Sequence, residues 1–153
     1  MSGTLLFEDQ WPHDGDLDFN DQVISYSVTT TVDSTGLASE LVATYNVLAI
    51  GTSTPSGLYL HLPGVSSSSS VSKGLLNGAT VGSLPNETDL VIPILDDTHS
   101  LFNSQSGYIN TQSTLTALGQ PIELDLRFTQ PVSLGDAPFD LFIARTSDYT
   151  HQV

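Results

Sequence analysis

Acidic side chains gather in one short stretch near the start of the chain. Residues 7–21 read FEDQWPHDGDLDFND and contain six carboxylates with no Lys or Arg among them. Carboxylate and amide oxygens are the ligands that hard divalent cations such as Ca²⁺ prefer in proteins. The candidate metal ligands in this stretch are Glu8, Asp9, Asp14, Asp16, Asp18, Asn20 and Asp21.

Three of these aspartates have the spacing with which a calcium loop begins. Asp14, Asp16 and Asp18 repeat the spacing of ligands 1, 3 and 5, which brings alternate carboxylates around one cation. The match then ends, because Phe19 stands where such loops carry a turn glycine and Ser25 where they carry a bidentate Glu. Further ligands must therefore come from outside this spacing, and the first two acids of the stretch are the nearest in sequence.

A solvated acidic loop is the alternative interpretation of this stretch. Trp11, Pro12 and Phe19 interleave the acids and would tie the stretch to the core, which holds like charges close together. A bound cation would neutralise them, and Ca²⁺ suits such a site better than Mg²⁺, which gives up its water reluctantly. We therefore expect calcium as the cofactor.

A second acidic pair, Asp96-Asp97, closes an apolar stretch, and Asn103 and Asn110 follow nearby. A turn at a strand end and a second calcium site, with Asp96 and Asp97 as ligands, are both open interpretations. Asp140 alternates out of another apolar stretch, near Asp136; an exposed carboxylate is expected, and a structural or metal-linked role is the alternative. The four histidines share no i, i+2 or i+4 spacing, so the sequence does not indicate a zinc site.

The sequence carries none of the common catalytic motifs. It has no GxSxG elbow, no HExxH, no glycine-rich phosphate loop and no Ser-x-x-Lys. Paired acids could serve a glycosidase, but a cation among crowded carboxylates would keep them ionised and leave none as a general acid. We expect that the protein is not an enzyme.

The elements that must position these residues alternate with a period of two. Such alternation is typical of half-buried antiparallel strands, and turn signals separate the segments. Ile24, Tyr26, Val28 and Val32 form the expected core face of one strand. The predicted strands are residues 23–32, 39–50, 57–64, 89–95, 121–128 and 139–145, with one short helical turn within 97–106 and a flexible loop at 66–70.

The predicted fold class is all-β: an antiparallel β-sandwich, jelly-roll-like, with calcium-binding loops. Its 153 residues are expected to form a single domain.

Composition narrows the possible partners. The chain has 17 Asp and Glu against 3 Lys and Arg, a net charge of -14, which would repel nucleic acids and anionic membranes. No apolar run approaches the ~20 residues of a membrane span, and the absence of Cys excludes disulfides and thiolate metal sites. An acidic, Lys-poor, Cys-free chain is what we expect of an exported module on a bacterial cell surface.

The pattern FEDxWPxxGDxDFND, followed by a predicted strand, resembles the opening of the LruC domain found in bacterial exported proteins. The resemblance covers nearly the whole chain from Leu5 onward, and three later stretches agree in order: residues 57–63, 91–99 and 137–143. Asp14 is not part of the family pattern, so the resemblance supports ligand roles for Asp16, Asp18 and Asp21 in particular.

The resemblance also implies a function. Similar domains lie near the tips of giant calcium-dependent bacterial adhesins, and some of them capture the C-terminal end of a peptide by using calcium to hold its carboxylate. It implies that the partner is a peptide or protein ligand on another cell; a glycan ligand and a purely structural calcium-stabilised domain are the alternatives. Because the family domain usually runs further, the chain is expected to be a fragment, one part of a split domain or a shortened member, with exposed strand edges.

Overall fold

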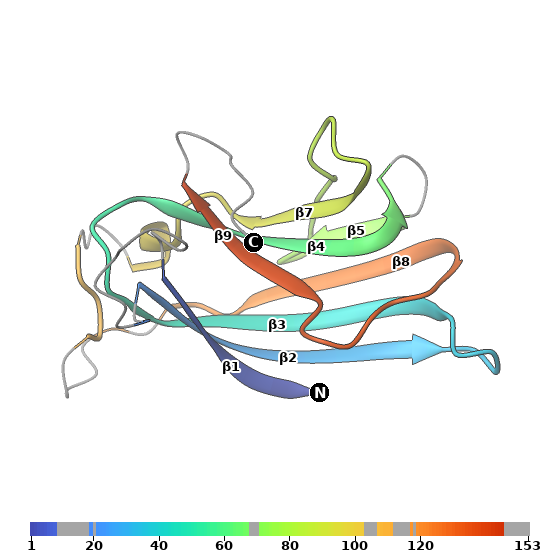
Figure 1. The fold of residues 1–153 in the computed structure, drawn as a ribbon, viewed down its shortest axis with the longest axis horizontal. Coiled ribbons are helices and arrows are strands. Elements are labelled where there is room, and N and C mark those ends of the chain that lie inside the picture. The colour runs from blue at the N-terminus through green and yellow to red at the C-terminus, as the bar shows by residue number, and fades with distance from the viewer. Residues whose placement is uncertain are drawn as a thin grey trace.

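Two antiparallel sheets pack face to face in a computed structural model that describes residues 1–8, 19, 21–67, 71–102, 107–111, 117 and 119–145 (Figure 1). The larger sheet has the order β1-β2-β3-β8-β5-β6 and the smaller one the order β7-β4-β9. The strands of the larger sheet are β1 (Ser2–Phe7), β2 (Gln22–Val32), β3 (Ala38–Ile50), β8 (Ile122–Val132), β5 (Val71–Leu76) and β6 (Ala79–Thr80). Those of the smaller sheet are β7 (Asp89–Leu95), β4 (Ser56–Ser66) and β9 (Asp140–Arg145), and the 3₁₀ helix η1 (Thr98–Phe102) follows β7.

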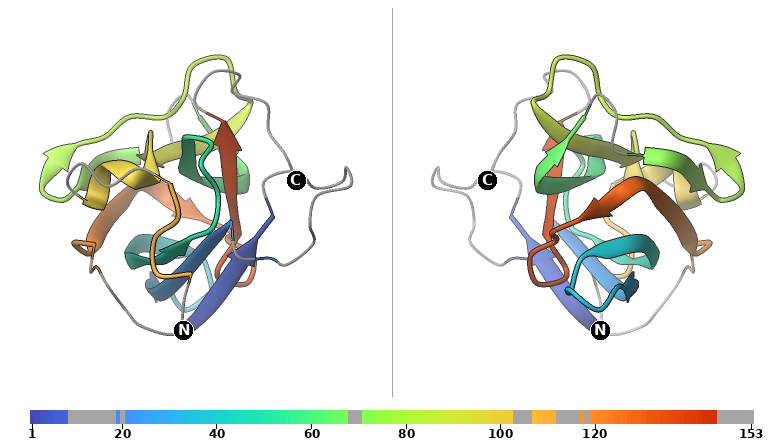
Figure 2. Two further views of the ribbon diagram at one scale, coloured as in Figure 1. Left: turned by 90° about the vertical axis from the view of Figure 1, so that its left-hand side faces the viewer. Right: turned by 90° about the vertical axis from the view of Figure 1, so that its right-hand side faces the viewer.

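The predicted all-β sandwich is confirmed. Every strand pair is antiparallel, and the chain crosses repeatedly from one sheet to the other, as jelly-roll sandwiches do. The two layers are seen from both ends in Figure 2. No helix in the described part of the chain is long and apolar enough to cross a membrane.

Apolar residues at alternate positions form the core between the sheets. Leu58, Leu60 and Leu62 of β4 belong to the same buried cluster as Leu41 and Tyr45 of β3. The expected core face of β2 holds at Ile24 and Val28, and Tyr26 is partly buried against the core, whereas Val32, which follows a register shift after Thr31, is 54% exposed.

The smaller sheet is covered on its outer face as well. Tyr59 of β4 stacks on Phe142 of β9, with ring centroids 5.4 Å apart, and Val91 and Ala144 complete a second buried cluster. This explains why β7 and β9 are more continuously apolar than the other strands.

One end of the sandwich gathers the connections that follow or precede seven strands. At this end β1, β3, β7 and β9 finish and β2, β4 and β8 begin (Figure 1, left). We call it the loop end; the connections there are residues 8–21, 51–55 and 96–121. Glu8 and Asp21, which bracket the first acidic segment, therefore lie at the same end of the molecule as Asp96 and Asp97.

Candidate metal centre

Two buried carboxylates stand at the base of the acidic stretch. Phe7 of β1 is paired with Gln22 of β2, so Glu8 and Asp21 are the next residues on the two strands of this hairpin. Each is only 7% exposed. Burial of one carboxylate beside another is costly unless hydrogen bonds or a cation compensate for the lost hydration.

Glu8 lacks part of that compensation. Its Oε2 is buried and has no hydrogen-bond partner among the described residues. Asp21 is fixed through its backbone, because its carbonyl accepts a hydrogen bond of 3.1 Å from the N–H of Gly51. A buried carboxylate oxygen without a donor is a candidate ligand for a cation.

Phe19 adopts the backbone conformation of a turn glycine. Its φ is +52°, in the left-handed region that bulky residues rarely occupy. In the spacing that starts at Asp14, Phe19 holds the sixth position, where calcium loops place a glycine for their sharp turn. The sequence departs from the calcium loop at this position, whereas the φ angle of Phe19 is one that a turn glycine adopts.

The other predicted ligands of this stretch, Asp9, Asp14, Asp16, Asp18 and Asn20, lie outside the described residues. Within the described part of the chain, no three His, Asp or Glu side chains form a group that could hold a metal ion. A cation at Glu8 and Asp21 would therefore need ligands from residues 9–20, as the sequence predicts.

A buried polar network fixes the base of the acidic stretch to the rest of the loop end. Gln22 Nε2 donates hydrogen bonds to Ser56 Oγ at 2.7 Å and to Thr98 Oγ1 at 3.0 Å, and Thr98 Oγ1 donates to the Ser56 carbonyl at 3.2 Å. Because Gln22 follows Asp21 directly, this network connects β2 and the acidic stretch with β4 and η1.

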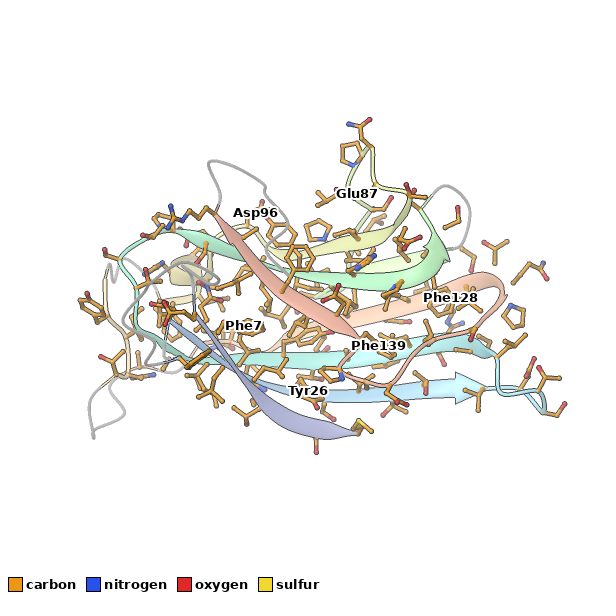
Figure 3. The ribbon with its side chains drawn as sticks, in the orientation of Figure 1. Phe7, Tyr26, Glu87, Asp96, Phe128 and Phe139 are labelled. Carbon is orange, nitrogen blue, oxygen red and sulfur yellow. The ribbon has the colours of Figure 1, made fainter. Side chains whose placement is uncertain are left out.

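The second acidic pair takes on a local structural role at Asp97. Its Oδ1 accepts a hydrogen bond of 3.0 Å from the backbone N–H of His99, and its carbonyl accepts one of 3.1 Å from the N–H of Ser100. Asp97 thus caps η1, as expected for the turn at a strand end. Asp96 beside it is exposed, near the loop end in Figure 3. Burial, and then the carboxylate of Asp96, raise the pKa of Tyr59.

Of the two asparagines near this pair, the structure describes only Asn110. Asn110 Nδ2 donates to the carbonyls of Leu48 and Ala117, at 2.9 and 2.7 Å, and so fixes the connection before β8. Asn103 lies outside the described residues. A second calcium site at Asp96 and Asp97 remains a prediction.

His61 forms a cluster that the sequence did not indicate. Its Nδ1 lies 2.7 Å from Oδ2 of Asp140 and its Nε2 lies 3.4 Å from Oδ2 of Asp89. Asp140 is thus half-buried and bonded to His61, contrary to the exposed carboxylate expected. The two carboxylates face diverging nitrogens of one ring, so the cluster ties β9 and β7 to β4 and does not form a single metal centre.

The basic side chains that the structure places in ion pairs lie away from the loop-end carboxylates. Lys73 Nζ is 2.5 Å from Oδ2 of Asp125, and Arg127 Nε is 3.0 Å from Oε1 of Glu40. Both pairs join neighbouring strands of the larger sheet, β5 to β8 and β8 to β3. Two of the three basic residues of the chain are therefore engaged in these pairs.

Comparison with known proteins places most of the chain in a family. A family model described as a domain of unknown function (DUF4842) matches residues 36–153. No curated protein and no solved structure matches the chain. The matched range includes β3 through β9, whereas the acidic stretch at residues 7–21 precedes it.

Proposed function

The chain belongs to the DUF4842 family, and we propose that it is a calcium-dependent ligand-binding module of an exported bacterial protein. The observation that carries the proposal is the burial of Glu8 and Asp21 at the base of a carboxylate-rich hairpin loop, with Oε2 of Glu8 left without a partner among the described residues. The glycine-like backbone at Phe19 supports it.

The donor set fits calcium. Glu8 and Asp21 would contribute carboxylate oxygens from the ends of the hairpin, and Asp16 and Asp18 would supply further ones from the loop. All of these donors are hard oxygens, and no cysteine or paired histidine competes for a softer metal. When bound, calcium would supply a local positive charge that can attract a carboxylate despite the chain's net charge of -14.

The ligand we propose is a peptide bound through its C-terminal carboxylate. The support is the resemblance of the acidic stretch to the LruC domain, together with the position of Glu8 and Asp21 at the loop end of the sandwich. A glycan ligand or a purely stabilising calcium ion would remain if this specific proposal failed.

The first test concerns calcium itself. Glu8→Gln keeps the size of the side chain but removes the charge, so we expect calcium affinity to fall at least tenfold, on the order of 1.4 kcal/mol or more. Isothermal titration calorimetry with calcium measures it, and Glu123→Gln, the same change at an exposed position on β8, should leave the affinity unchanged. Equal calcium affinities in the two variants would show that Glu8 is not a calcium ligand.

The second test concerns the carboxylate. A peptide that binds in saturating calcium is compared with the same peptide carrying a C-terminal amide, which removes the formal charge and nearly preserves the shape. We expect affinity to fall at least tenfold. An amide that binds as well as the acid would refute the calcium–carboxylate contact and leave calcium binding by the protein unaffected.

A further inference from the structure

Exposed apolar side chains cluster on the outer face of the larger sheet at the loop end. Leu6 is paired with Val23, and Val23 with Ala49, next to a bulge that turns Leu48 outward. Leu6 and Leu48 are 57% and 39% exposed. We call Leu6, Val23 and Leu48 the loop-end patch.

The patch borders an open strand edge. β1 is the last strand of the larger sheet on this side, and among the described strands only β2 pairs with it. Its backbone N–H and C=O groups along the outer edge are therefore available to another extended chain. In Figure 2 this edge lies along one side of the sandwich, and β1 runs directly into the acidic stretch through Glu8.

The edges of the smaller sheet are less suited to such an addition. β7 carries Pro93 and has register shifts against β4, both of which discourage further pairing. β9 has a regular edge, but its outward side chains Phe142 and Ala144 are already buried. The remaining edge strand, β6, has only two residues. Among the longer described edge strands, β1 alone combines an open edge with exposed large apolar side chains.

We propose that an extended peptide pairs with the free edge of β1 and places an apolar side chain on the loop-end patch. The proposal rests on the proposed ligand-binding function and adds the class of ligand: a strand-forming peptide with an aliphatic or aromatic residue near its end and no acidic side chains. Acidic side chains would meet Glu8 and Asp21, and a second copy of the chain would bring another -14 charges to the same surface.

A pair of matched variants tests the patch. Peptides that bind the wild-type protein are taken from a random octapeptide library with free C-termini, screened in millimolar calcium, and their affinities are then measured by calorimetry. Leu6→Thr removes apolar surface but keeps a strand-forming residue, and it should weaken binding about tenfold. Val42→Thr makes a similar change at another exposed apolar position of the same sheet, 43% exposed on β3, and should leave binding unchanged.

Backbone methylation of the peptide tests the edge. In a paired strand alternate N–H groups face the neighbour, so methylating successive peptide nitrogens singly should alternate between at least tenfold loss and little effect. A uniform effect of methylation, or equal affinities of the Leu6→Thr and Val42→Thr proteins, would overturn the proposal, as would a library from which no peptide binds.

These results are separable from the fate of the calcium proposal. Calcium titration of the Leu6→Thr protein without peptide should give the wild-type affinity. If peptides bind equally well in chelator and still depend on Leu6 and on alternate N–H groups, the edge site stands and the calcium-dependent function fails. If calcium binds but the affinity of the peptides depends neither on Leu6 nor on alternate N–H groups, the calcium site stands and the edge site fails.

Discussion

Glu8 and Tyr45 are alike in burial but differ in their surroundings. Glu8 is a buried carboxylate with an oxygen left without a partner, and Tyr45 is a buried phenol in the same condition among the described residues. The carboxylate has cation ligands nearby in sequence and is therefore a candidate for function. The hydroxyl of Tyr45 lies within the apolar core cluster, so its burial is a cost without a compensating contact.

Tyr45→Phe is accordingly expected to stabilise the protein, by roughly 1 kcal/mol. Burial raises the pKa of Tyr45, so above about pH 10 the unfolded chain loses the phenolic proton while the folded protein retains it. The stability that this proton contributes is therefore present below pH 10 and is lost as the pH rises further. Urea unfolding at pH 7 and at pH 10.5 measures both effects, and Tyr45→Phe should reduce the alkaline loss.

The exposed Tyr108 provides the control for this substitution. Tyr108→Phe removes an exposed hydroxyl and should leave the stability at pH 7 unchanged. If Tyr45→Phe destabilises the protein at pH 7, the Tyr45 hydroxyl has a partner that the described residues do not include.

At the scale of elements, close backbone approaches decide which residues the strands accept. Gly57 in β4 is one such position, because a Cβ added there would lie 2.7 Å from the carbonyl oxygen of Leu95 in β7. Since that neighbour is backbone, it cannot move aside without disturbing the pairing of β4 with β7.

Gly57→Ala should therefore destabilise the protein by about 1–3 kcal/mol, through a lower midpoint of urea unfolding. Gly82→Ala is the matched control: an added Cβ would meet nothing within 4 Å, and the stability should change by less than about 0.5 kcal/mol. A Gly57→Ala protein as stable as the control would show that β4 and β7 are not packed as described.

The apolar pattern was sufficient to predict the strands that bury a face but not the others. β2, β3, β4, β7, β8 and β9 correspond to predicted segments, because each buries one or both faces with apolar residues. β1, β5 and β6 were missed: β1 and the two-residue β6 are mostly exposed, and β5 carries Lys73 and Gly74 in its middle. Their pairing partners, rather than their own residues, make them strands.

The candidate site was predicted in part for the same reason. Glu8 and Asp21 belong to one continuous acidic stretch, so the sequence identifies them without knowledge of the fold. The contacts of His61 with Asp89 and Asp140 span 28 and 79 residues and depend on the order of strands in the smaller sheet. No local spacing could have predicted them.

The whole molecule carries a large excess of negative charge, which a bound cation would partly offset. Seventeen acidic residues face three basic ones, and two of the basic residues already pair with acids of the larger sheet. Arg145, at the end of β9, is then the one Lys or Arg at the loop end, where Glu8, Asp21, Asp96 and Asp97 lie. A divalent cation bound there would act on the stability of the entire fold, because the acidic stretch joins β1 to β2.

Calcium at ~1,000 times its dissociation constant should stabilise the folded state by ~4 kcal/mol, which raises the melting temperature by roughly 10 °C. Thermal melts in millimolar calcium and in excess chelator measure the shift. Magnesium at the same concentration should produce a smaller one, and Glu8→Gln should diminish the effect of calcium. Identical melts in calcium and chelator would contradict the proposed site.

The pairing of β1 also determines how the domain would respond to tension. Residue 1 lies at the end of β1 far from the loop end, whereas β9 finishes at the loop end with Arg145 (Figure 1). A pull between these two points runs along β1 and slides it past β2, so the register from Ser2↔Ser27 to Phe7↔Gln22 is sheared as a unit and is not unzipped pair by pair. Forced unfolding is governed by the rate at which such a unit breaks. A cation bound at the β1–β2 hairpin and a peptide paired with the edge of β1 would both reinforce the strand that carries the force. The domain with calcium and peptide bound would then withstand a given force for longer than the free domain.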